Sequence, residues 1–163
     1  MSTSERSAPV DPDVDLHVPA QRRARAIDPA VLGVIAVGGV LGAEARFALE
    51  RWFPAGDGAW PLATFGINLS GSLLLGALMV VLTELTSPHR LVRPFLGVGV
   101  LGGYTTFSTA MVEVPELMGA GRPGLALAYL VASAIGALLA AALGAAAARA
   151  VAASRRRVRR SRR

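Results

Sequence analysis

Residues 62–82 have the sequence LATFGINLSGSLLLGALMVVL, which is 21 residues without a charge. A helix that crosses the hydrocarbon core of a bilayer needs about 20 apolar residues, and uncharged runs of this length are rare in water-soluble cores. Three further blocks have the same character: residues 30–49, which are uncharged up to Ala43, residues 94–112 and residues 125–148. The sequence therefore predicts an all-α membrane protein with four transmembrane helices.

Segments rich in proline, glycine and charge separate these blocks, as turns require, at residues 54–61, 83–93 and 114–123. A buried helical bundle in a soluble protein is the alternative, but its helices would carry a polar face, which these blocks lack. The chain is 53% hydrophobic and only 17% charged, which argues against a soluble enzyme. It has no cysteine, so disulfides, thiolate metal sites and thiol catalysis are excluded.

The charges divide the chain into three parts. Residues 1–28 are polar, with four arginines and five acids, so we expect a flexible N-terminal tail. Residues 29–148, the predicted transmembrane domain, carry five arginines and six acids, whereas residues 149–163 carry eight arginines and no acid. The formal net charge of +6 therefore belongs to an Arg-rich C-terminal tail.

Arginine placement predicts how the chain lies in a cell membrane, because cytoplasmic flanks retain basic residues. With four spans both termini lie on one side, which would hold fourteen of the 17 arginines and leave Arg46, Arg51 and Arg122 opposite. We therefore expect both termini in the cytoplasm. The tail could instead bind anionic lipid or nucleic acid, but no aromatic residues interleave its arginines, and we expect no nucleic-acid partner.

The N-terminal region imitates a secretory signal, because Arg22, Arg23 and Arg25 precede an apolar run that ends at the small-residue pattern Ala43-Glu44-Ala45. Cleavage there would leave three spans. We expect an uncleaved first helix instead.

Small residues recur at i, i+4 spacing, and such faces drive helix packing in lipid, where no hydrophobic force acts between helices. The pairs are Gly38 and Gly42, Gly66 and Ser70, Ser72 and Gly76, Gly99 and Gly103, and Ala132 and Gly136. Four helices make a thin bundle, so this many small faces indicates an oligomer.

Polar side chains inside the spans are more informative, because each must be satisfied within the protein or face water. They form three stripes: Thr64, Asn68 and Ser72 in the second block, Thr105, Thr106, Ser108, Thr109 and Glu113 in the third, and Tyr129 and Ser133 in the fourth. A bond to the carbonyl four residues earlier explains any one hydroxyl. Three converging stripes with a buried asparagine favour a polar pathway.

The chemistry of this pathway suits a small anion. Hydroxyl and amide donors dominate the spans, which contain neither lysine nor histidine. Phe107 adds the positive edge of an aromatic ring. Nucleophilic catalysis would need a base beside a serine or threonine, and Glu44 and Glu113 are the only candidates, so the sequence does not indicate an enzyme.

Three segments carry recognisable motifs: GGVLGAEARF at residues 38–47, TFGINLSGS at residues 64–72 with Gly76 after it, and GVLGGYTTFST at residues 99–109. They resemble the GGxxGAxxR, TxxxNxxGS…G and GxxGGxTTFST runs of the fluoride channel family called Fluc or CrcB. The third motif is highly specific. All three occur in order, and the resemblance covers residues 29–148.

The resemblance implies a passive fluoride-selective channel, in which fluoride exchanges its hydration water for converging donors and ring edges and escapes from the cytoplasm. It implies two subunits packed antiparallel, with the third helix broken near its middle, after Gly102-Gly103. The backbone carbonyls of Gly102 and Thr105 would hold a structural sodium ion at the dimer centre. The implied pore-lining residues are Asn68, Phe107, Ser108, Thr109, Glu113, Tyr129 and Ser133.

Arg46 matches the arginine that closes the first motif, and the resemblance implies that it draws anions toward a vestibule. The alternative is that it pairs with Glu44 or Glu50.

Ala110 departs from the family pattern, which places a second phenylalanine three residues after Phe107. Alanine offers no ring edge, and the arginine bias favours one orientation, whereas an antiparallel homodimer needs both. These observations favour a heterodimer with an oppositely oriented homologue over a homodimer. The alternative is that Ala110 is tolerated and the tail does not lock the topology.

Two other functions stay open. A proton-coupled small multidrug exporter would also have four spans, but it needs a membrane-embedded carboxylate, and Glu44 lies two residues from Arg46 near a helix end. A structural subunit that stabilises a partner's pore is the third hypothesis.

Overall fold

The computed structural model describes residues 28–56 and 58–161, and all regular secondary structure in these residues is helical. Four helical segments are long and apolar enough to span a membrane: Pro29–Trp52, Leu62–Leu85, Pro94–Gly119 and Pro123–Ser154. The prediction of an all-α protein with four spans is confirmed. The predicted flexible tail, residues 1–28, lies outside the described residues except for Asp28.

The spans are built from seven helical elements. The first span is α2 (Pro29–Trp52), and the second is α3 (Leu62–Val80) followed by the π-helical turn η1 (Val81–Leu85). The third consists of the π-helical η2 (Pro94–Leu101), the short α4 (Gly102–Tyr104) and α5 (Ser108–Gly119), and the fourth is α6 (Pro123–Ser161).

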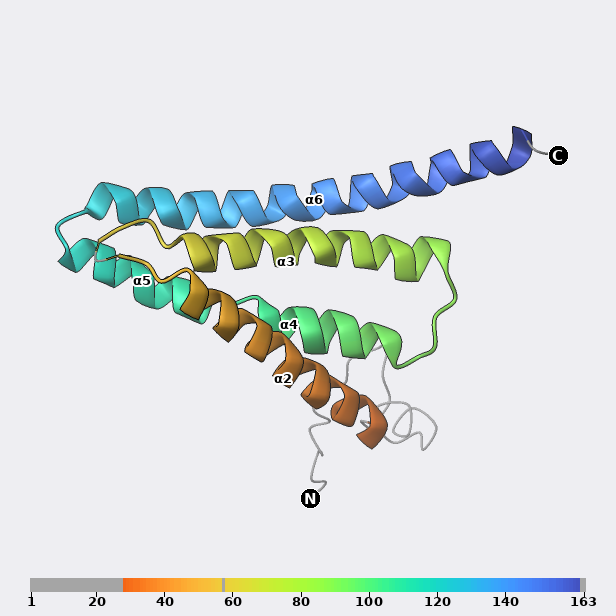
Figure 1. Cartoon of the computed structure of the whole chain (residues 1–163), viewed down its shortest axis with the longest axis horizontal. Helices are drawn as coiled ribbons and strands as arrows, with labels where there is room; N and C mark the ends of the chain where they lie inside the picture. The colour runs from red at the N-terminus through yellow and green to blue at the C-terminus, as the bar shows by residue number, and fades with distance from the viewer. Residues whose placement is uncertain (1–27, 57, 162–163) are drawn as a thin grey trace, which may run out of the picture.

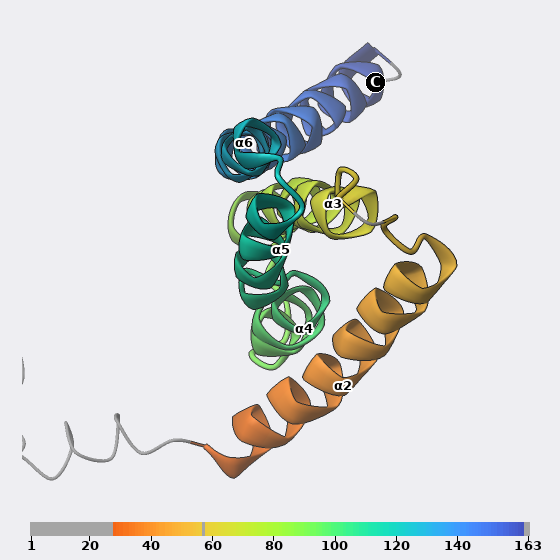
Figure 2. The same cartoon turned by 90° about the vertical axis from the view of Figure 1, so that its left-hand side faces the viewer.

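The four spans form a thin, splayed bundle. In Figure 1, α6 lies along α3, the third span runs beside α3 on the other side, and α2 crosses the third span obliquely. The end view in Figure 2 shows α3 and α5 next to α6, α4 beyond them, and α2 farthest from α6. The third span therefore contacts each of the others, and its irregularities lie near the middle of the molecule.

Glycines allow the closest crossings, as the small-residue pattern predicts. A Cβ atom on Gly38 would lie 2.6 Å from the carbonyl oxygen of Phe95 in η2, and one on Gly76 would overlap the backbone of Ala141 in α6. The predicted pairs do not all act within one chain, because a Cβ on Gly66 would meet nothing within 4 Å. Many large apolar side chains, such as Leu62 and Leu138, face outward, as expected for a surface covered by lipid or by a second subunit.

The fourth helix is longer than the predicted block, which ended at Ala148. Its 39 residues correspond to about 58 Å at 1.5 Å per residue, and Figure 1 shows it continuing past the end of α3. Arg149 of α6 donates to both carboxylate oxygens of Glu84 in η1, at the end of the second span, with its shortest contact at 2.7 Å. The helix continues because the residues after Gly144 are mainly alanine and arginine, which are strong helix formers.

Candidate functional site

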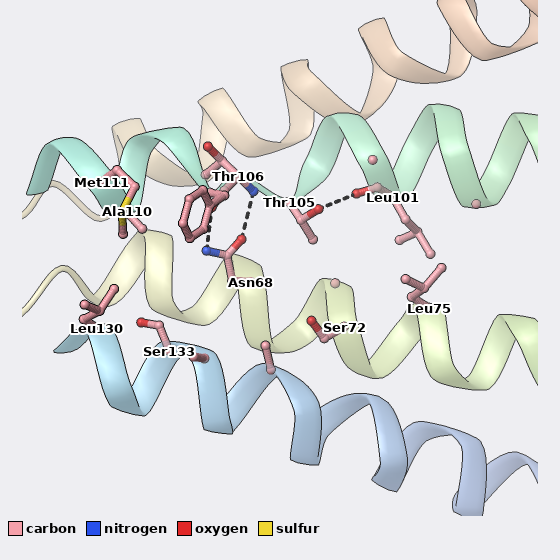
Figure 3. Close-up of a pocket in the computed structure, with 16 residues that line it drawn as sticks. Asn68, Ser72, Leu75, Leu101, Thr105, Thr106, Ala110, Met111, Leu130 and Ser133 are labelled. Atoms are coloured by element: carbon pink, nitrogen blue, oxygen red, sulfur yellow. Dashed lines mark hydrogen bonds between the residues drawn. The ribbon is translucent and has the colours of Figure 1, made fainter. Parts of the chain in front are cut away.

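The third span is broken between α4 and α5, at residues 105–107, as predicted. Asn68 of α3 bridges this break with both ends of its amide. Its Nδ2 donates to the carbonyl oxygen of Thr106 at 2.7 Å, and its Oδ1 accepts from the Thr106 amide at 2.8 Å (Figure 3). An asparagine amide offers the same donor and acceptor as a peptide group, so it replaces helical hydrogen bonds that the break removes.

The hydroxyl of Thr106 organises the start of α5. Its Oγ1 accepts from the amide of Thr109 at 3.1 Å, which satisfies one of the amides without a partner at a helix N-terminus. It also shares hydrogen bonds with the hydroxyls of Thr109 at 2.9 Å and Ser108 at 3.3 Å. Two of the predicted pore residues, Ser108 and Thr109, are therefore tied to the break itself.

A groove of about 380 Å³ lies beside the break, between α3, the third span and α6. Three predicted pore residues line it: Asn68, Phe107 and Ser133. Phe107 is 74% exposed, so its ring has few contacts within the chain, and Ser133 Oγ is buried without a hydrogen bond to any described residue. Ala110 shares the groove with Phe107, as its spacing predicts, but it is only 4% exposed.

Glu113 is half-buried where α3, α5 and α6 meet. Thr64 of α3 donates to its Oε1 at 2.5 Å, and Tyr129 of α6 donates to its Oε2 at 2.6 Å. Tyr129 is fully buried, and its ring meets Trp60 edge-on with centroids 5.5 Å apart. Hydroxyl donors on two other helices thus satisfy a carboxylate within the spans, as such a group requires.

A second hollow of about 390 Å³ opens at the end of the bundle where α5 meets the loop between α2 and α3. Glu113 and Glu116 line this hollow, and Glu113 does not line the groove. The predicted pore residues therefore lie in three places: in the groove, at the start of α5 beside the break, and around the Glu113 carboxylate. Their role in ion passage stays a prediction.

Arg46 contacts the break from α2. Its Nε donates to the carbonyl oxygen of Gly103 at 3.3 Å, and its NH1 lies 3.7 Å from Glu50. Of the two predicted partners, the structure therefore pairs Arg46 with Glu50. Its role in drawing anions stays a prediction.

Sequence reasoning did not assign a separate role to Thr64 or Thr106, although both belong to the predicted polar stripes. Thr64 lies one helical turn before Asn68, so the shared face was visible in the sequence. The partner on the other helix was not, because no local pattern specifies which residues meet across a bundle.

A family model described as "CrcB-like protein, Camphor Resistance (CrcB)" matches residues 33–145, which is more than half of the chain. This chain belongs to the CrcB family. Every residue of the candidate site lies inside the region that matches the CrcB model.

Curated relatives agree with the CrcB assignment. "Fluoride-specific ion channel FluC 2" of Streptomyces avermitilis is 46% identical over 124 residues, which are 76% of this chain and 78% of the relative. "Fluoride-specific ion channel FluC 1" of Streptomyces coelicolor is 50% identical over 107 residues, 66% of this chain and 70% of the relative. "Fluoride-specific ion channel FluC 2" of Nocardia farcinica is 45% identical over 118 residues, 72% and 84% of the two chains.

These names describe ion channels, so the prediction that the chain is not an enzyme is confirmed by its family. Together with the four apolar helices, they show a multi-pass membrane protein.

Proposed function

We propose that this chain forms a passive fluoride-selective channel that lets cytoplasmic fluoride leave the cell. The observation that carries the proposal is the groove at the break, where the exposed ring of Phe107, the amide of Asn68 and the hydroxyl of Ser133 come together. Fluoride holds its water tightly, so a pore must offer several converging donors and ring edges in exchange. The CrcB family model spans this part of the chain, and three relatives of the chain are named as fluoride-specific channels.

The break also fits a structural sodium ion held by the backbone carbonyls of Gly102 and Thr105. The amides that would bond these carbonyls in a continuous helix, those of Thr106 and Thr109, donate to side-chain oxygens instead. Neutral oxygen ligands suit a hard cation. The ion would supply a fixed positive charge at the centre of the assembly.

An antiparallel dimer, with an oppositely oriented homologue rather than a second copy, accounts best for the remaining features. Ala110 leaves the groove without a second aromatic ring. Streptomyces avermitilis has both a FluC 2 and a FluC 3 that are similar to this chain, so more than one such protein occurs in one organism.

The placement of arginines supports an orientation with both termini in the cytoplasm. Arg90 pairs with Asp28 at the start of α2, and Arg149 pairs with Glu84 in η1, where the second span ends. Arg51 instead lies in the last turn of α2, and Arg122 directly precedes α6. The basic excess of the end that holds Arg90 and Arg149 would face the cytoplasm of a cell membrane.

Ion efflux from liposomes tests the function. The full-length chain is reconstituted alone and together with a co-expressed homologue, and release of fluoride and of chloride is measured with ion-selective electrodes. We expect the pair to release fluoride but not chloride, without a proton gradient, and the chain alone to release little.

Each of the other outcomes would contradict one part of the proposed function. Strong fluoride release by the lone chain, inserted in both orientations, contradicts the heterodimer. Release that stops when a protonophore removes the gradient favours an exporter. If Phe107→Ala in this chain leaves fluoride release by the co-expressed pair unchanged, that result favours a purely structural subunit.

A further inference from the structure

Two backbone carbonyls at the break lose their helical hydrogen bonds in the same manner. In a continuous helix the Gly102 carbonyl accepts from the amide of Thr106, and the Thr105 carbonyl accepts from the amide of Thr109. Here the Thr106 amide donates to Asn68 Oδ1 at 2.8 Å, and the Thr109 amide donates to Thr106 Oγ1 at 3.1 Å. A side-chain oxygen takes each donor away from its carbonyl.

The neighbouring carbonyls of Gly103 and Thr106, in contrast, do accept hydrogen bonds. The carbonyl of Gly103 accepts from Arg46 Nε at 3.3 Å, and that of Thr106 accepts from Asn68 Nδ2 at 2.7 Å. The side chains around the break thus satisfy these two carbonyls and withdraw the donors from the other two. Thr106 is only 8% exposed, so water competes little for these bonds.

We propose that Asn68 and Thr106 are positioning residues that keep the carbonyls of Gly102 and Thr105 unbonded and available to a cation. The proposal rests on the sodium site of the proposed function, and it assigns the availability of the ligands to two specific side chains. Without the Asn68 oxygen, the Thr106 amide would return to the Gly102 carbonyl. Without the Thr106 hydroxyl, the Thr109 amide would return to the Thr105 carbonyl.

Asn68 therefore has a task besides lining the groove. Its amide nitrogen carries two hydrogens, and one of them is already committed to the Thr106 carbonyl. In the proposed channel, the other hydrogen would be left as a donor for the anion.

The test measures sodium-dependent thermal unfolding of the full-length protein, purified in its oligomeric form, while sodium chloride replaces potassium chloride at constant ionic strength. Asn68→Leu removes both hydrogen bonds of the Asn68 amide to Thr106 and keeps a side chain of similar size. Thr106→Val removes only the Thr106 hydroxyl, whereas Thr106→Ser keeps a hydroxyl at this position. Ser70→Ala is the matched control, because this α3 hydroxyl bonds to Ile67 and Tyr104 but diverts no amide.

We expect the wild-type unfolding temperature to rise with sodium and to saturate. Asn68→Leu and Thr106→Val should weaken the apparent sodium affinity about 10- to 100-fold, as changes next to metal ligands do. Thr106→Ser and Ser70→Ala should keep the wild-type sodium dependence. If Asn68→Leu does not fold, the difference in sodium affinity between Thr106→Val and Thr106→Ser tests the proposal.

Unfolding temperatures that fall in both variants with unchanged sodium affinity would show a merely structural role and overturn the proposal. A wild type that does not respond to sodium overturns the sodium site and this proposal together. The expected sodium pattern in a protein without fluoride release would contradict the channel and still support the positioning role.

Discussion

Replacing Tyr129 by phenylalanine removes one hydroxyl from a fully buried side chain and keeps the ring that packs against Trp60. The lost interaction is the 2.6 Å bond to Glu113, the bond by which α6 reaches the carboxylate on α5. Hydrogen bonds between helices in membrane proteins contribute about 0.6 kcal/mol on average and about 1.7 kcal/mol at most. Because the acceptor is a carboxylate, which forms a stronger hydrogen bond than a neutral group, we expect Tyr129→Phe to lower the free energy of unfolding by about 1 to 1.7 kcal/mol.

Unfolding in mixed micelles, with dodecyl sulfate as the denaturant and tryptophan fluorescence as the signal, measures this loss. Trp60 reports directly, because it touches the Tyr129 ring. The control is Thr83→Val, which removes a hydroxyl that bonds only to Met79 within its own helical segment. A double-mutant cycle with Glu113→Gln isolates the coupling. Equal stability of Tyr129→Phe and wild type, or an equal loss in Thr83→Val, would refute the reasoning.

Three further predictions use the unfolding assay, and one of them also uses the liposome assay. Gly38→Ala should cost about 1–3 kcal/mol by overpacking against η2, because its Cβ would lie 2.6 Å from a backbone oxygen, whereas Gly39→Ala meets nothing within 4 Å and should be tolerated. Phe107→Ala should abolish fluoride release in the liposome assay and barely change stability, since the ring is 74% exposed. Asp28→Ala should cost about 1 kcal/mol, because Asp28 caps α2 and pairs with Arg90, and Arg90→Gln should cost less, because it removes only the ion pair.

The number and the placement of the spans followed from the sequence, because uncharged runs of this length are typical of transmembrane helices and rare in water-soluble cores. The end of the fourth span did not. Alanine and arginine are both strong helix formers, so the change in charge at Arg149 marked a change of surroundings and not the end of α6.

The site was predicted in part. The i, i+4 spacing of Thr64 and Asn68 correctly placed them on one face, directed toward the third span. The sequence did not show that Asn68 would bond the backbone of Thr106, or that Thr64 and Tyr129 would share Glu113. These contacts join residues at least 16 positions apart, and helix propensity carries no information about them.

The sequence by itself determined that this protein is a four-span membrane protein of the CrcB type, because hydropathy and motifs can be read directly along the chain, and the resemblance to that family implied the broken third helix. Only the tertiary structure decided which polar groups satisfy one another. In the spans, buried donors and acceptors must find partners within the protein, and the fold sets which ones meet. In this fold the Thr106 amide donates to Asn68, and the Glu113 carboxylate accepts from two hydroxyls.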